Sequence, residues 1–234
     1  AWLSRLVLQA RAAISPSAGF SLRAVQRFFV VSFPVMVYRL IPWWVGAGLG
    51  FVAVTTVIGA IVSNDLSIAV SLYGEARIRE YVEHDFEAYY SENPPQSFAS
   101  LIWLNNTLVS AVCLASGVLI LPTLVVLWVN ALSLGVAGGA MVGYGRADVF
   151  FGLITVHGLL ELTCVFIAAG AGLRLGWSWI APGRYLTRTQ ALAQTGRQTV
   201  VVALGLGVAL LVSGLVEAFV TPAPMPIAVR LLIG

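Results

Sequence analysis

The chain has 234 residues, of which 59% are hydrophobic and only 10% are charged. Soluble domains are roughly 45–50% apolar and about 25% charged, so this composition excludes a cytosolic enzyme, a disordered chain and a nucleic-acid-binding protein. An integral membrane protein remains. All 13 basic residues are arginine and the net charge is +3, so the positions of the charges are more informative than their sum.

The first 40 residues mix apolar and basic side chains, with five arginines and no acid. Leu3, Leu6 and Val7 begin an apolar series at helical spacing. Basic amphipathic helices lie in the plane of the lipid headgroups, so we predict an interfacial segment over residues 1–40. This segment either anchors the chain to the membrane surface or docks a cytoplasmic partner. Because the sequence starts at Ala1 rather than Met, we expect further residues to precede it.

Residues 41–220 predict about five membrane-spanning helices, each needing about 20 apolar residues. The expected spans, in chain order, are 41–63, 99–119, 123–143, 149–173 and 199–220. Residues 99–143 are uncharged but too long for one span, and Pro122 disfavours an uninterrupted helix. A re-entrant hairpin over this stretch is the alternative to two spans. Residues 221–234 form a tail or the start of a sixth span.

The predicted fold class is therefore all-α, a polytopic transmembrane bundle. Outside the membrane we predict one acidic helix over residues 65–92, which Asn93-Pro94-Pro95 ends. Its apolar positions recur at the spacing of a single helical face. They are Ile78, Tyr81, Val82, Phe86 and Tyr89. This helix either caps the bundle or docks an extracytoplasmic protein.

Charges between the spans set the predicted orientation. Residues 1–40 hold five arginines and residues 174–198 hold four, and neither stretch contains an acid. Residues 64–98 hold seven acids and two arginines. Because arginine-rich segments face the cytoplasm, we expect the N-terminus and residues 174–198 inside, and residues 64–98 outside, the cytoplasmic membrane.

Few polar groups fall within the spans, and each is a functional candidate because it is costly to bury in lipid. Counted by helical rise, most lie in the outer half of the bilayer, with Glu161 near its middle. The predicted intramembrane polar cluster consists of Asn105, Asn106, His157, Glu161 and Glu217. His157 and Glu161 are four residues apart on one helical face and can pair.

Three interpretations of this cluster stay open. A metal site has little support, since His157 and Glu161 supply two ligands, zinc takes three or four, and Glu217 would have to be the third. A proton or ion relay fits a histidine that titrates near neutrality. The third interpretation is a structural clasp between helices. Protease motifs are absent from the sequence, and we expect no enzyme activity, metal or cofactor.

Two further patterns concern packing and the cytoplasmic end. Glycine and alanine repeat at every fourth position in three spans, at 46/50, 135/139/143 and 168/172/176, which predicts close helix packing. Four arginines are candidates for contacts with anionic lipid or an acidic partner. They are Arg174, Arg184, Arg188 and Arg197.

Five motifs occur in an order typical of the stage II sporulation protein M family. They are Asn105-Asn106, Val129-Asn130-Ala131, His157-Gly158-x-x-Glu161-Leu162, Ala171-Gly172-Leu173-Arg174-Leu175-Gly176, and Glu217-Ala218-Phe219-Val220-Thr221-Pro222. The chain resembles this family over nearly its whole length, and looks like the branch found in high-GC bacteria. Family members commonly have proline before the His-Gly pair, where this chain has Val156, so no proline kink is expected there.

The resemblance implies a polytopic protein of the cytoplasmic membrane. In endospore formers it implies a scaffold that works with peptidoglycan-degrading partners during engulfment, with no established catalytic activity of its own. In other bacteria the genes tend to lie beside those for a MoxR-type AAA ATPase and an RDD-family membrane protein. The family also leads us to expect a longer N-terminal region and a further C-terminal span than the printed sequence holds.

Two functions follow as hypotheses. The first is a non-enzymatic membrane scaffold that recruits or organises cell-envelope (peptidoglycan-remodelling) or other membrane partners, as a homo- or hetero-oligomer. The alternative is a transporter or lipid-handling protein that uses the outward-facing polar cluster. A cavity lined by His157, Glu161 and Glu217 would favour the alternative, and a dry, paired cluster would favour the scaffold.

Overall fold

The computed structural model describes residues 21–80, 82 and 95–220, with the side chains of 95–102, 152–158 and 216–220 left out of the description. Within these ranges every regular element is a helix, which confirms the all-α class. The N-terminal elements are α2 (Leu22–Arg27), a π-helical turn (Phe28–Ser32), α3 (Phe33–Arg39), α4 (Ile41–Asn64), α5 (Ser67–Tyr73) and α6 (Glu75–Glu80). The remaining elements are α8 (Pro95–Ser116), a 3₁₀ turn (Gly117–Leu119), α9 (Leu121–Gly143), α10 (Ala147–Ile180) and α11 (Arg188–Val220).

Four helical segments are long and apolar enough to cross a membrane. They are Ile41–Asn64, Leu121–Gly143, Leu159–Ile180 and Arg188–Leu215. The remaining expected span, 99–119, corresponds to α8 together with the 3₁₀ turn that follows it, and their described apolar part, Trp103–Leu119, is shorter. The chain is therefore a membrane protein with at least four span-like helices, and the count of five stays a prediction.

The chain turns sharply between α8 and α9, in the middle of the uncharged stretch 99–143. The 3₁₀ turn follows Ser116, and Ile120 then adopts a left-handed φ of 61°. Pro122 lies in the first turn of α9, where its missing N–H costs no helical hydrogen bond. The Thr123 hydroxyl donates to the Cys113 carbonyl oxygen at 3.1 Å, which fastens the turn. The predicted break near Pro122 is thus present.

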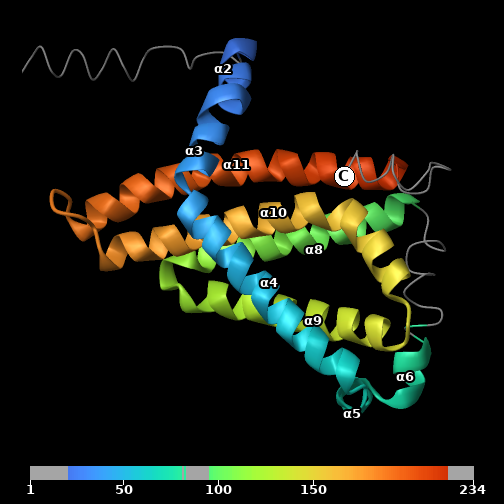
Figure 1. Ribbon diagram of the computed structural model, residues 1–234. Coiled ribbons are helices and arrows are strands. Elements are labelled where there is room, and N and C mark those ends of the chain that lie inside the picture. The colour runs from blue at the N-terminus through green and yellow to red at the C-terminus, as the bar shows by residue number, and fades with distance from the viewer. Residues whose placement is uncertain (1–20, 81, 83–94, 221–234) are drawn as a thin grey trace, which may run out of the picture.

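Helix α10 lies at the centre of the bundle and contacts α4, α8, α9 and α11 (Figure 1). Its small residues allow this close approach. A Cβ atom added at Gly172 would collide with the carbonyl oxygen of Cys113 on α8, and one added at Gly170 would lie 2.6 Å from the backbone nitrogen of Trp44 on α4. The first part of α10, yellow in Figure 1, bends away from the rest without a proline.

The glycine repeat of α9 packs against α4, which runs beside it in the same direction. Gly135 and Gly139 lie so close to α4 that an added Cβ would meet its atoms within about 3 Å, and a Cβ at Gly143 would lie 2.7 Å from Leu66, just after α4. The Thr55 hydroxyl donates to the Ala131 carbonyl oxygen at 3.2 Å along the same interface. By contrast, the repeat at Gly46 and Gly50 on α4 faces open space.

The described part of the N-terminal segment is helical and continues into α4 with a change of direction at Leu40. Figure 1 shows α2 projecting beyond α11, whereas α3 lies against α11. The Phe33 ring packs so tightly on Gly205 of α11 that a Cβ there would collide with it. Trp44 Nε1 donates to the Val37 carbonyl oxygen at 3.1 Å, which fixes α3 relative to α4. The predicted position in the headgroup plane stays a prediction.

The acidic helix predicted over residues 65–92 is interrupted. Gly74 has a φ of 85°, a left-handed conformation that suits glycine and ends α5 before α6 begins. Ile78 and Val82 are buried, as the predicted apolar face requires. Tyr81, Phe86 and Tyr89 lie outside the described residues.

Helix α11 begins at Arg188, well before the predicted start at residue 199. A capping box explains the early start. The Thr187 hydroxyl accepts from the Gln190 backbone N–H at 3.2 Å, and the Gln190 side chain accepts from the Thr187 N–H at 3.0 Å. The polar first turns are thereby stabilised, although hydropathy alone would leave them outside the helix.

Candidate functional site

The candidate site is centred on Glu161, a carboxylic acid in the middle of the bundle. Glu161 lies on α10, the most central helix, and is 3% exposed. The Asn106 side-chain amide on α8 donates a hydrogen bond to Glu161 Oε2. Burying a carboxyl group without a partner is costly, so this contact both satisfies the acid and joins α8 to α10.

A third helix closes the site from the other side. Ser213 on α11 is buried and lies close enough to interact with the Glu161 carboxyl group. The neighbouring Gly214 leaves room for Trp103 of α8, because an added Cβ there would lie 3.2 Å from Trp103 Cβ. Asn106, Glu161 and Ser213 thus bring α8, α10 and α11 together at one level of the bundle.

The face of α8 that carries Asn106 holds more polar atoms than the sequence prediction included. Trp103 Nε1, Thr107 Oγ1 and Ser110 Oγ are buried without a hydrogen-bond partner among the described residues, as is Glu161 Oε1. Their spacing along α8 places them on the same side as Asn106. The interface of α8 with α10 and α11 is therefore polar over more than one turn.

The structure brings together two of the five predicted cluster residues. Asn105 is exposed, and the hydrogen bond to the Glu161 carboxyl group comes from its neighbour Asn106. The backbones of His157 on α10 and Glu217 on α11 are helical, but their side chains lie outside the description. The predicted pairing of His157 with Glu161 and the contribution of Glu217 therefore stay predictions.

The described part of this arrangement is a hydrogen-bonded carboxyl group. Among the residues that the structure describes, no three His, Cys, Asp or Glu side chains come together. Cys113 and Cys164 are both buried free thiols in the apolar core. What the described part of the site provides is one acid, one amide and several hydroxyl groups.

The predicted basic contacts occupy the end of the bundle where α10 and α11 are joined, which we call the arginine end. Arg174 lies over the ring of Trp43 on α4, with its Cζ atom 5.9 Å from the ring centroid, and Arg188 lies at the same distance from Trp179. Both distances suit cation–π contacts. Arg184 and Arg197 are exposed. Arginine and tryptophan together are typical of a membrane–water interface.

Sequence reasoning missed Ser213, Thr107 and Ser110. Burying a hydroxyl group in a membrane span costs little free energy, so serine and threonine are common there. The residue type alone therefore does not indicate a functional site. The available signal was spacing: Thr107 and Ser110 share a helical face with Trp103. Ser213 precedes Glu217 by one helical turn and was not predicted, and the predicted contribution of Glu217 stays a prediction.

Comparisons with known proteins match most of the chain to one family. Searches against curated proteins and against solved structures gave no significant match. The family described as stage II sporulation protein M (SpoIIM) matches residues 48–222, which include α8 to α11 and the Asn106–Glu161 contact. This match covers most of the chain and confirms the resemblance of its motifs. The chain belongs to the stage II sporulation protein M family.

Proposed function

We propose that this protein is a non-enzymatic scaffold of the cytoplasmic membrane, which recruits or organises cell-envelope (peptidoglycan-remodelling) or other membrane partners. The observation that carries the proposal is the closure of the polar site. Glu161 is 3% exposed and is bound by Asn106. A carboxyl group used in this way holds helices together and presents nothing to a solute.

The orientation follows from charge. The arginine end and the N-terminal segment face the cytoplasm, and residues 64–98 face outward, because arginine-rich segments are retained inside. α4 and α9 then run outward, and α8 and α10 run inward. The parallel packing of α4 with α9 supports this order.

Two surfaces are available to partners in this scheme. At the cytoplasmic surface, Arg184, Arg188 and Arg197 are exposed, and described carboxylates do not pair with them. At the outer surface, α5 and α6 cover the end of α9, and α6 carries exposed charges. The first surface suits an acidic cytoplasmic protein, and the second suits an extracytoplasmic protein. Family membership supports the second surface, since the resemblance implies a scaffold for partners on the envelope side.

The alternative is a transporter or lipid-handling protein, and one observation favours it. Glu161 Oε1, Thr107 Oγ1 and Ser110 Oγ lack hydrogen-bond partners among the described residues. Such groups occur along ion or proton paths in transporters. The two functions differ in what they require of Glu161: the scaffold needs its packing, and the transporter needs its acidity.

Glu161→Gln separates these requirements because the two side chains have the same shape. In a strain that depends on this protein, we expect Glu161→Gln to retain both abundance and envelope phenotype, since the amide oxygen still accepts from Asn106. Glu161→Ala should lower abundance, with loss of function in proportion. Normal abundance of Glu161→Gln with complete loss of function would refute the scaffold and favour the transporter.

A further inference from the structure

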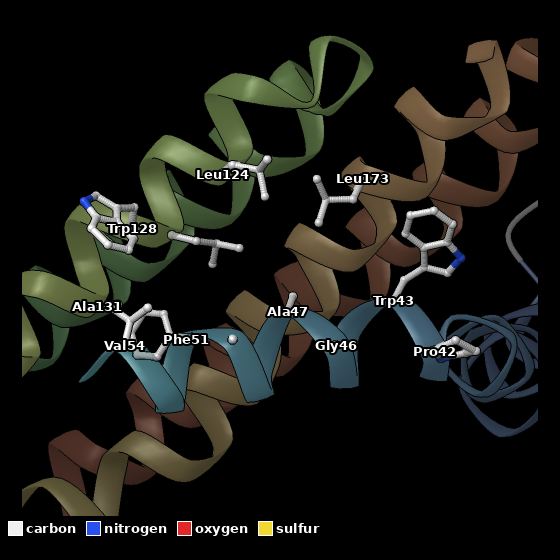
Figure 2. Close-up of a pocket in the computed structure, with 12 residues that line it drawn as sticks. Pro42, Trp43, Gly46, Ala47, Phe51, Val54, Leu124, Trp128, Ala131 and Leu173 are labelled. Carbon is white, nitrogen blue, oxygen red and sulfur yellow. The ribbon is translucent and has the colours of Figure 1, made fainter. Parts of the chain in front are cut away.

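A groove opens on the membrane-facing side of the bundle, away from the polar site. It lies between α4 and α9, with α10 as its floor, and has a volume of ≈ 470 Å³. Figure 2 shows Leu124 and Trp128 of α9 on one side, Trp43 and Ala47 of α4 on the other, and Leu173 of α10 between them. The groove exists because α4 and α9 pack tightly near Gly59 and Gly139 and diverge toward their first turns.

The walls of the groove are apolar and its α4 side is flat. Gly46 and Gly50 line it, and an added Cβ at either position would have nothing within 4 Å. Trp128 borders it with 53% of its surface exposed. The volume falls within the range of small-molecule sites, about 300–1,000 Å³, and its length along two helices suits an extended acyl chain.

The mouth of the groove is basic and aromatic. Trp43 lines the groove, and the Arg174 guanidinium lies over its ring with Cζ 5.9 Å from the centroid. The ring of Trp177 lies 6.1 Å from that of Trp43 and extends the cluster. Arg174 follows Leu173 in α10 and is half-buried. Within the described ranges, carboxylates form no ion pair with it.

These observations define a site with two chemically different parts. Apolar surface lies deeper in the membrane, and an arginine without an acidic partner lies at the level where tryptophans mark the headgroup region. Basic pockets between spanning helices bind anionic lipid headgroups. We propose that this groove holds one acyl chain of an anionic phospholipid whose phosphate is bound by Arg174. This site is separate from Glu161 and does not depend on the scaffold function.

The positive charge of Arg174 at the mouth of the groove favours an anionic lipid as the occupant over a helix of a partner protein. A second helix would fill the apolar groove equally well, but it would leave the Arg174 guanidinium without an anion. A phospholipid satisfies both parts with one molecule. Arginine also suits a phosphate through paired N–H donors, which an anionic headgroup can accept.

The test uses the full chain in phosphatidylcholine vesicles that contain a trace of phosphatidylglycerol with a photoactivatable group on one acyl chain. After illumination, we expect labelled peptides from α4 and α9 that include Gly46 and Trp128. The yield should exceed that of a matched phosphatidylcholine probe by about fivefold, the effect of one arginine near the surface. Equal labelling by the two probes would overturn the proposal.

Matched variants locate the two parts of the site. Arg174→Gln should reduce the phosphatidylglycerol yield to that of phosphatidylcholine, whereas Arg79→Gln, which changes an arginine of α6 that is paired with Glu75, should leave it unchanged. Gly46→Leu fills the groove and should abolish labelling by both probes. Gly207→Leu is its control, because Gly207 also has open space around it. Unchanged labelling of Gly46→Leu would overturn the proposal.

One more variant distinguishes a lipid from a second copy of the chain. Gly46→Cys places a thiol in the groove, while the native Cys113 and Cys164 stay buried. With lipid in the groove, oxidation should yield little disulfide-linked dimer. A quantitative dimer through residue 46 would assign the groove to a second copy and overturn the proposal.

Discussion

Asn106→Ala removes the amide that donates to Glu161 and leaves the buried carboxyl group with Ser213 as its described neighbour. Hydrogen bonds to charged groups contribute about 1.5–3 kcal/mol in soluble proteins. Interhelical hydrogen bonds within membranes average about 0.6 kcal/mol and reach about 1.7 kcal/mol. Because Glu161 is 3% exposed and central to three helices, we expect a loss of about 1–2 kcal/mol, near the top of the membrane range.

The free energy of unfolding is measured by titrating SDS into the purified protein in mixed micelles. Asn105→Ala is the matched control, since it removes the same side chain from the adjacent, exposed position and should change stability by less than about 0.5 kcal/mol. A double-mutant cycle with Glu161→Leu then isolates the Asn106–Glu161 coupling. Equal effects of the two asparagine variants, or a coupling near zero, would refute the clasp.

Three further outcomes test the packing. Gly172→Ala should lower the unfolding free energy by about 1–3 kcal/mol or prevent folding, because its Cβ would collide with the Cys113 carbonyl oxygen. Gly207→Ala, with open space around it, should leave the unfolding free energy unchanged or raise it by up to about 1 kcal/mol. The same titration measures both. Thr187→Ala should cost about 1 kcal/mol and speed amide hydrogen exchange in the first turn of α11, and unchanged exchange there would argue against the capping box. Cys113 and Cys164 should resist maleimide in membranes and react after SDS unfolding; labelling of folded protein would contradict their burial.

The apolar segments were predictable because a run of about 20 apolar residues without charge is typical of a membrane-spanning helix. α4 matches its predicted span within a residue at each end, and α9 begins two residues early and ends at residue 143 as predicted. Helix ends outside the apolar runs were not predictable in this way. α11 extends into polar sequence because a local capping box, rather than hydropathy, determines its start.

The interruption at Gly74 illustrates a different limit. Periodicity predicts which residues share a helical face, and Ile78 and Val82 are indeed buried. It does not report the backbone angle of one glycine, which here divides the predicted helix into α5 and α6. The sequence pattern does not distinguish a glycine that ends a helix, such as Gly74, from a glycine that allows two helices to pack closely.

The candidate site was predictable in its chemistry and partly in its members. Asn106 and Glu161 were expected because buried polar groups in lipid require partners, and the structure joins them. Adjacent positions on a helix point about 100° apart, so Asn105 and Asn106 cannot both face α10. The choice between them depends on the rotation of α8, and the only sequence signal for that rotation is the spacing of Trp103, Thr107 and Ser110, which share a face with Asn106. The groove beside Arg174 depends on the angle between α4 and α9, a tertiary property that the sequence pattern does not express.

Crosslinking and purification from native membranes tests the scaffold most directly, using the full chain, Asn106→Ala and a triple variant with Gln at 184, 188 and 197. The scaffold predicts that Asn106→Ala lowers protein abundance but keeps the partner yield per molecule. It predicts that the triple variant keeps normal abundance and loses its cytoplasmic partners. Equal partner yields from all three proteins, or specific crosslinks to lipid alone, would contradict the account.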